Sequence, residues 1–203
     1  MRVIAGEHRG RRLAAPRGST TRPTPERVRE AVFSALESRL GGPGSLAQAR
    51  VLDLYAGSGA LGIEALSRGA RLAVFAERDP AALTALRANL EALQLGARAR
   101  LLPGDAARAL ARLAAAGERF EAVFLDPPYG GGEGARALAG VGGGGLLRPG
   151  GVVILEHAAR EAAPEVPGLA REPTRRYGSV SVTFYSPAAA AAPAVPPRTE
   201  AAP

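Results

Sequence analysis

The chain has 203 residues, of which 46% are hydrophobic and 22% are charged, and this composition is typical of one α/β domain with a small appendage. Cysteine is absent, which excludes disulfide bonds, thiolate metal sites and cysteine nucleophiles. No stretch approaches the roughly 20 apolar residues that a membrane-spanning helix needs, and the start of the chain lacks a secretory signal. We therefore expect a cytoplasmic protein with no membrane partner and no bound metal.

The net charge of +7 is unevenly distributed along the chain. All 26 basic residues are arginine, as expected from GC-rich coding, so the total charge is weak evidence for a nucleic-acid partner. Residues 1–30 nevertheless hold eight arginines against three glutamates. This local excess favours a nucleic-acid-binding surface over the alternative, a solvated run of charges.

Residues 1–23 are predicted to form a basic, hairpin-like arm. Its two strands are expected at 3–5 and 11–13, with Gly6 and Gly10 bracketing the turn. A helix is predicted to begin at Thr24-Pro25-Glu26, because Thr is a good N-cap and Pro suits the first turn. Its buried stripe follows from apolar residues at helical spacing, namely Val28, Val32, Phe33, Leu36 and Leu40.

From residue 50 onward, predicted strands alternate with predicted helices. The strands are expected at 51–55, 72–76, 100–102, 122–125, 152–155 and 180–185, and the helices at 60–68, 80–95 and 106–115. Helical stretches of this length between strands imply parallel crossovers, so the predicted fold is α/β with a doubly wound, mostly parallel sheet. Residues 24–187 form the expected main domain, and the Ala- and Pro-rich residues 188–203 form an expected disordered tail.

A glycine loop, Gly57-Ser58-Gly59, follows the first strand of this domain. Glycine lets a ligand approach the main chain closely, and in doubly wound sheets ligands bind beyond the carboxyl ends of the strands. No Gly-Lys-Ser/Thr follows, so a nucleoside triphosphate site of the P-loop type is not indicated. On its own, the glycine pattern is also compatible with a plain tight turn.

Acidic residues stand at the ends of three successive predicted strands. Asp53 would repel a pyrophosphate but suits an ammonium group, Glu77 can accept hydrogen bonds from ribose hydroxyls, and Asp105 can accept from an adenine amino group. Ammonium, ribose and adenine without a phosphate clamp describe S-adenosylmethionine better than NAD. The predicted cofactor-binding residues are Thr24, Asp53, Tyr55, Gly57, Ser58, Gly59, Glu77, Arg78, Asp105 and Ala106.

The tetrapeptide Asp126-Pro127-Pro128-Tyr129 closes the fourth strand of the domain and is predicted to be catalytic. An amino group on an aromatic ring is a poor nucleophile because its lone pair is delocalised into the ring. The Asp126 carboxylate and the Pro127 carbonyl can accept its two N–H groups, while Tyr129 offers a face on which a flipped-out base can stack. A rigid proline turn without chemistry is the alternative interpretation.

These motifs resemble the Rossmann-like amino-methyltransferases, and within them the bacterial RsmD family. The resemblance covers residues 2 to about 185 and is carried by residues 2–6, 9–13, 22–24, 27–30, 53–70, 126–129, 146–151 and 177–178. It implies a class I methyltransferase fold with a seven-stranded sheet. It further implies methyl transfer from S-adenosylmethionine to N2 of the guanine at position 966 of 16S ribosomal RNA, free or in the assembling small subunit.

The resemblance also implies roles for individual residues. Asp53, Gly57, Glu77 and Asp105 would hold the cofactor, and the tetrapeptide would hold the base. The arm would contact ribosomal RNA, and the expected RNA ligands are Arg9, Arg11, Arg12 and Arg22.

Other functions share part of this pattern. An adenine-N6 or cytosine-N4 DNA methyltransferase has the same tetrapeptide, but such enzymes usually need an additional target-recognition region for which this chain has no room. A glutamine methyltransferase of release factors typically has Asn at the first motif position. A non-catalytic RNA-binding module with the same fold would not need Asp126 or the complete cofactor loop.

Overall fold

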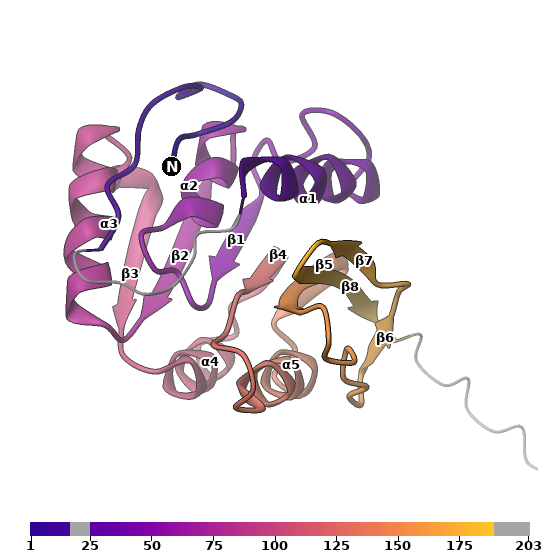
Figure 1. Ribbon diagram of the computed structural model, residues 1–203. Coiled ribbons are helices and arrows are strands. Elements are labelled where there is room, and N and C mark those ends of the chain that lie inside the picture. The colour runs from indigo at the N-terminus through magenta and orange to yellow at the C-terminus, as the bar shows by residue number, and fades with distance from the viewer. Residues whose placement is uncertain (17–24, 189–203) are drawn as a thin grey trace, which may run out of the picture.

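The computed structural model describes residues 1–16 and 25–188, which form one sheet covered by helices on both faces (Figure 1). The strand order across the sheet is β3-β2-β1-β4-β5-β8-β6, with β7 also paired to β8. The elements are α1 (Glu26–Arg39), β1 (Arg50–Asp53), α2 (Ala60–Ser67), β2 (Leu72–Glu77), α3 (Pro80–Ala92), η1 (Gly96–Arg98), β3 (Ala99–Pro103), α4 (Ala106–Ala115), β4 (Phe120–Leu125), α5 (Glu133–Gly143), β5 (Leu147–Ala158), β6 (Leu169–Arg171), β7 (Arg175–Tyr177) and β8 (Val180–Pro187).

The first five strands are parallel, and β8 runs antiparallel to β5. The chain enters the sheet at β1, winds outward to β3, and then returns to the other side of β1 through β4. This confirms the predicted doubly wound, mostly parallel sheet. The winding direction reverses between β1 and β4, and in such sheets the crevice beyond the carboxyl ends of the strands at this point is where ligands bind.

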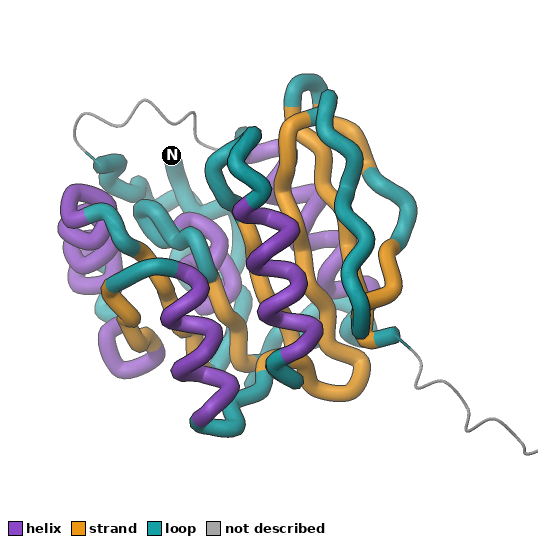
Figure 2. The backbone as a smooth tube through the Cα atoms, turned by 90° about the horizontal axis from the view of Figure 1, so that it is seen from below, coloured by secondary structure: helices purple, strands orange, loops and turns teal. Residues whose placement is uncertain are grey.

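Helices cover both faces of the sheet (Figures 1 and 2), and a hydrophobic core lies between the sheet and the helices on each face. Side chains of the arm, α1, α2 and α3 fill the core on one face of the sheet. Side chains of α4 and α5 fill the core on the other face. No helix in the described part of the chain is both long and apolar enough to span a membrane.

The sheet has eight strands, where seven were expected. The two short strands β6 and β7 both pair with the outer edge of β8, β6 opposite residues 185–187 and β7 opposite residues 180–182. Pro173 lies between them, and proline has no N–H to donate to a strand ladder. The seventh position across the sheet is therefore shared by two strands.

Helix α5 was not predicted from the sequence. Its segment is rich in glycine, which disfavours a helix, yet Ala137, Leu138 and Val141 are buried at helical spacing. Packing explains why one of these residues is glycine, because a Cβ on Gly140 would lie 2.8 Å from Leu110 Cδ1 of α4. Close contact between α4 and α5 offsets the poor helix propensity.

The predicted hairpin strands of the arm are reduced to a single antiparallel bridge, Arg2 to Arg12. The two segments still pair through backbone hydrogen bonds, from the Val3 N–H to the Arg11 carbonyl at 2.9 Å, from the Gly10 N–H to the Val3 carbonyl at 2.9 Å and from the Leu13 N–H to the Met1 carbonyl at 3.0 Å. The pairing does not extend over Ile4 and Ala5, because the arm docks on α2 there. The buried carboxylate of Glu64 accepts the N–H groups of Ile4 at 2.8 Å and Ala5 at 3.0 Å. These N–H groups are therefore satisfied by a side chain of the main domain.

The start of α1 also differs from the prediction. The helix begins at Glu26, and its N-cap position is occupied by Pro25 in an extended conformation without a side-chain cap. The Pro25 carbonyl accepts from the N–H groups of Val28 and Arg29. Thr24, Arg22 and residues 189–203 of the predicted tail lie outside the described residues.

Candidate active site

The strand ends bring the predicted acidic residues together at one edge of the sheet. Asp53 ends β1 and Glu77 ends β2, its parallel neighbour. On the other side of β1, Asp53 is in register with Phe124 of β4, so Asp126 follows two residues beyond that point. Because all of these strands are parallel, the glycine loop, Glu77 and the tetrapeptide lie beyond the same edge of the sheet.

The loop between β1 and α2 has left-handed backbone at both glycines, with φ of 55° at Gly57 and 87° at Gly59. A Cβ on Gly59 would lie 2.4 Å from Leu86 Cδ1, so packing against α3 requires glycine there. A Cβ on Gly57 would meet no atom within 4 Å. The space beside the Gly57 main chain is therefore open, and the contact of this loop with a cofactor stays a prediction.

Asp53 is buried and holds the first turn of α2. One carboxylate oxygen accepts the Gly62 N–H at 2.9 Å. The pKa of Asp53 is raised to about 7, mainly by burial; the Gly62 hydrogen bond opposes this rise and the nearby charge of Glu77 adds to it. A cationic group bound beside this carboxyl would stabilise its charged form, which is the chemistry expected for the ammonium of a methionine moiety.

Glu77 connects the glycine loop to the end of β2. One oxygen accepts the Gly57 N–H at 2.7 Å, and the other accepts the N–H groups of Arg78 at 2.7 Å and Asp79 at 2.8 Å. A carboxylate oxygen has two acceptor sites, so these three bonds leave one site, on the oxygen that accepts from Gly57, for a ribose hydroxyl. The sequence predicted a ligand contact at Glu77 and missed this role in positioning the loop.

Asp105 is exposed and forms the N-cap of α4, where one of its oxygens accepts the Arg108 N–H at 2.8 Å. Ala106 is the first residue of that helix. Capping is sufficient to explain an acidic residue here, although the second oxygen can still accept from an adenine amino group.

The remaining predicted cofactor residues have further partners. Arg78 is exposed and lies 3.7 Å from Glu133 of α5, forming an ion pair between the β2 end and α5. Tyr55 is half-buried near Arg78 and Glu133, and its pKa is raised to about 12 by burial and by the charge of Glu133. Ser58 is buried, and its carbonyl accepts from the Asn89 side chain at 2.9 Å.

Asn89 of α3 is a positioning residue that sequence reasoning missed. Its carboxamide oxygen accepts the Ala14 N–H at 2.7 Å, and its nitrogen donates to the Ala14 carbonyl at 3.1 Å as well as to Ser58. This buried side chain therefore joins the arm to the glycine loop. A polar residue on the buried face of an otherwise apolar helix is the sequence signal that could have found it.

The tetrapeptide directly follows β4. Asp126 is partly exposed, Pro127 is buried, and the Tyr129 ring is 45% exposed, the one large hydrophobic side chain so exposed in residues 1–16 and 25–188. The protein around the Asp126 carboxyl and the charge of Glu156 raise its pKa well above the usual range. Pro128 is exposed beside the tyrosine. The arrangement presents an acid and an aromatic face at one surface.

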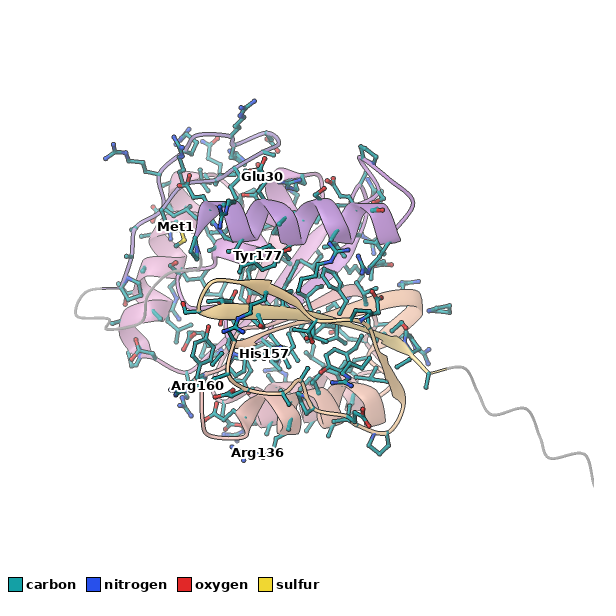
Figure 3. All side chains as sticks on the ribbon, turned by 45° about the vertical axis from the view of Figure 1, so that its right-hand side comes forward. Met1, Glu30, Arg136, His157, Arg160 and Tyr177 are labelled. Carbon is teal, nitrogen blue, oxygen red and sulfur yellow. The ribbon has the colours of Figure 1, made fainter. Side chains whose placement is uncertain are left out.

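Glu156 is the acidic residue of this site that sequence reasoning missed. It lies on β5 one residue past the predicted strand end, is only 7% exposed, and accepts the Tyr129 hydroxyl at 3.2 Å. Glu156 directly precedes His157, whose label marks this part of β5 in Figure 3. The sequence signal was present, because Glu156 follows a run of buried apolar residues within its strand, just as Asp53 and Glu77 do in theirs.

The three described arginines of the predicted RNA surface, Arg9, Arg11 and Arg12, are all exposed. Arg11 donates to the carbonyl of Ala92 at the end of α3 at 3.0 Å. The arm passes over the helices α2 and α3 (Figure 1) and reaches the glycine loop through Ala14 and Asn89. The arm therefore carries its basic side chains on its solvent-exposed side, while its inner side is joined to the glycine loop through Asn89.

The family model described as Conserved hypothetical protein 95 matches residues 1–186 of the chain. The Bacillus subtilis protein YlbH, named as a candidate rRNA methyltransferase, is 38% identical over 186 residues, which span 91% of this chain and 98% of that protein. Ribosomal RNA small subunit methyltransferase D of Escherichia coli is 41% identical over 129 residues, 64% of this chain and 60% of that enzyme.

Solved structures show the same fold. The structure of yhhF from Escherichia coli, named as a candidate methyltransferase, superimposes with a TM-score of 0.79 at 34% identity, covering 92% of this chain and 97% of that one. The Thermus thermophilus 16S rRNA N2 G1207 methyltransferase RsmC, solved with AdoMet and guanosine, has a TM-score of 0.59 at 29% identity, covering 82% of this chain and 44% of that one. The expected Rossmann-like methyltransferase fold is thereby confirmed.

Proposed function

Because the chain belongs to the family of Conserved hypothetical protein 95, we propose that it is an S-adenosylmethionine-dependent RNA methyltransferase of the RsmD type. The target is the N2 amino group of a guanine, position 966, in 16S ribosomal RNA. The observation that carries the proposal is the tetrapeptide at residues 126–129, which stands beyond β4 beside the glycine loop of β1.

The residues around the glycine loop fit the cofactor. S-adenosylmethionine supplies an electrophilic methyl group on a sulfonium when it is bound. The open main chain at Gly57 admits a ligand, and the buried Asp53 carboxyl suits its ammonium group. Glu77 would accept from a ribose hydroxyl and Asp105 from the adenine amino group, in addition to their present backbone bonds.

Asp126 would hold the target nitrogen. Its carboxylate accepts one N–H of the amino group and the Pro127 carbonyl accepts the other, so that the nitrogen lone pair points away from both acceptors. Positioning of this kind lowers the barrier without a covalent intermediate. As the nitrogen bonds to the methyl carbon, the bond from that carbon to sulfur would break and the sulfur would keep the electron pair. The nitrogen would become cationic and lose one proton, which the Asp126 carboxylate would accept and pass to water.

Tyr129 and the arm would hold the RNA. The exposed tyrosine ring offers a stacking face for the base at about 1–3 kcal/mol. The exposed arginines of the arm would contact phosphates, and Arg22 would join them. These contacts need no base sequence, so they position the RNA, and the site itself chooses the base.

The test is transfer of a radiolabelled methyl group to small ribosomal subunits, or to free 16S ribosomal RNA, from cells that lack the modification. Nucleoside digestion should yield N2-methylguanosine. N6-methyladenosine or N4-methylcytidine would instead support the alternative tetrapeptide enzymes. Tight RNA binding without transfer and without cofactor binding would support a non-catalytic RNA-binding module.

A further inference from the structure

Two carboxylates stand side by side at the edge of the sheet where the target base would lie. Strands β4 and β5 are parallel neighbours, and Leu125 is in register with Leu155. The next residues are Asp126 on one strand and Glu156 on the other, and adjacent strands are about 4.8 Å apart. The fold thus places Glu156 next to the residue proposed to hold the target amino group.

Glu156 is also hydrogen-bonded to Tyr129, whose ring is the proposed stacking face. It is 7% exposed and accepts the hydroxyl of Tyr129 at 3.2 Å, which links the carboxylate to the exposed ring. The charge of Glu156 raises the pKa of both Asp126 and Tyr129, so all three groups share one electrostatic environment. A base stacked on Tyr129 with its amino group at Asp126 would have its adjoining ring nitrogen near Glu156.

That adjoining ring atom differs between the bases that carry an amino group. In guanine, the ring nitrogen N1 beside the 2-amino group carries a hydrogen and is a donor. In adenine and cytosine, the ring nitrogen beside the amino group is an unprotonated acceptor. A carboxylate can only accept, so it attracts a guanine edge and repels the other two.

We propose that Glu156 determines the base specificity of this enzyme by accepting the N1–H of the guanine whose N2 amino group Asp126 holds. This inference rests on the proposed function and adds the residue that selects the base. The three donors of the guanine edge, N1–H and two N2–H, then meet three acceptors, which are Glu156, Asp126 and the Pro127 carbonyl. The Tyr129 hydroxyl keeps the Glu156 carboxylate in place.

The test uses 2-aminopurine, which keeps the 2-amino group but has an acceptor at N1. Small subunits are reconstituted with either guanine or 2-aminopurine at the target position, and kcat/KM for methyl transfer is measured on both. A site built around a hydrogen bond rejects an analogue that lacks the donor, so the wild-type enzyme should favour guanine by about 100-fold or more. Glu156→Gln, whose amide can either accept or donate, should reduce this ratio by at least about tenfold.

Two variants separate selection from general damage. Glu165→Gln changes a side chain that is 81% exposed and paired with Arg171, so it should keep the wild-type ratio. Tyr129→Phe retains the ring and removes the hydroxyl that orients Glu156, so it should lower the ratio by a smaller factor than Glu156→Gln does. Cofactor affinity, measured by calorimetry, shows whether each variant remains folded.

The outcomes are distinct. If wild-type enzyme methylates guanine and 2-aminopurine equally, or if Glu156→Gln slows both substrates by the same factor, Glu156 has only a structural role and this inference is overturned. If wild-type enzyme produces no N2-methylguanosine at all, the proposed function itself has failed. A collapsed ratio in Glu156→Gln with an unchanged ratio in Glu165→Gln supports base selection by Glu156.

Discussion

Glu77 allows a quantitative test of the cofactor site, because its carboxylate accepts three backbone N–H groups. In Glu77→Gln only one of the two terminal atoms can accept. The amide oxygen will turn toward Arg78 and Asp79, where it satisfies two donors, and the amide nitrogen will then face the N–H of Gly57. Two donors in contact repel each other, so the variant should release the glycine loop from the end of β2.

The magnitude follows from the bond that is lost. A hydrogen bond to a charged group contributes about 1.5–3 kcal/mol. Glu77 is partly exposed, so water can replace part of this bond, and the lower end of the range applies. We therefore expect S-adenosylmethionine to bind about tenfold more weakly. Loss of a ribose contact in the same variant would add to this effect.

The assay is isothermal titration of the variant with S-adenosylmethionine, with Glu91→Gln as the matched control on the exposed face of α3. The control should bind like the wild type. If Glu77→Gln also binds like the wild type, the contact between Glu77 and Gly57 does not organise the cofactor site, and our assignment of the site to this strand end is wrong.

Three further predictions concern the base, the buried acid and the arm. Asp126→Ala should abolish methyl transfer while cofactor affinity stays within about fivefold, because the proposed cofactor contacts lie at other strand ends; turnover within tenfold of wild type would remove Asp126 from the mechanism. Asp53 has a folded pKa of about 7, raised from 3.8, so the folded state loses up to about 4 kcal/mol as the pH rises from about 4 through 7. The Tm of the cofactor-free protein should fall between pH 5 and pH 8 more steeply in the wild type than in Asp53→Asn, and equal slopes would contradict this assignment. Finally, replacing the arm residues Arg9, Arg11 and Arg12 together by alanine should lower the salt dependence of RNA binding by about two to three units of slope. The control replaces three exposed arginines on helices, Arg87, Arg108 and Arg112, and should leave this slope unchanged.

The sequence was sufficient to predict the parts of the fold in which local pattern and global packing agree. Strands β1, β2 and β4 are buried apolar runs followed by polar residues, so both their positions and the acids at their ends could be found. Parallel pairing then brings those acids to one edge of the sheet. Local sequence patterns can therefore predict which distant segments come together at a candidate site.

The missed features depend on contacts that are distant in the sequence. Helix α5 forms because Leu110 of α4 packs closely on Gly140, although the segment itself is a poor helix former. The pairing within the arm stops short of two full strands because Glu64 takes the N–H groups of Ile4 and Ala5. Glu156 was overlooked because the strand was predicted to end at Leu155. In each case a partner far along the chain decides the outcome.

The contacts of Asn89 have a consequence for how the chain can be divided. Its carboxamide binds both Ala14 and Ser58 in the protein interior, so removal of the arm would leave buried polar groups without partners. Each such group costs about 1–3 kcal/mol. A chain that starts at residue 25 should therefore lose cofactor affinity as well as RNA affinity. Residues 1–16, whose outer face we propose to bind RNA, therefore fold as an integral part of the main domain.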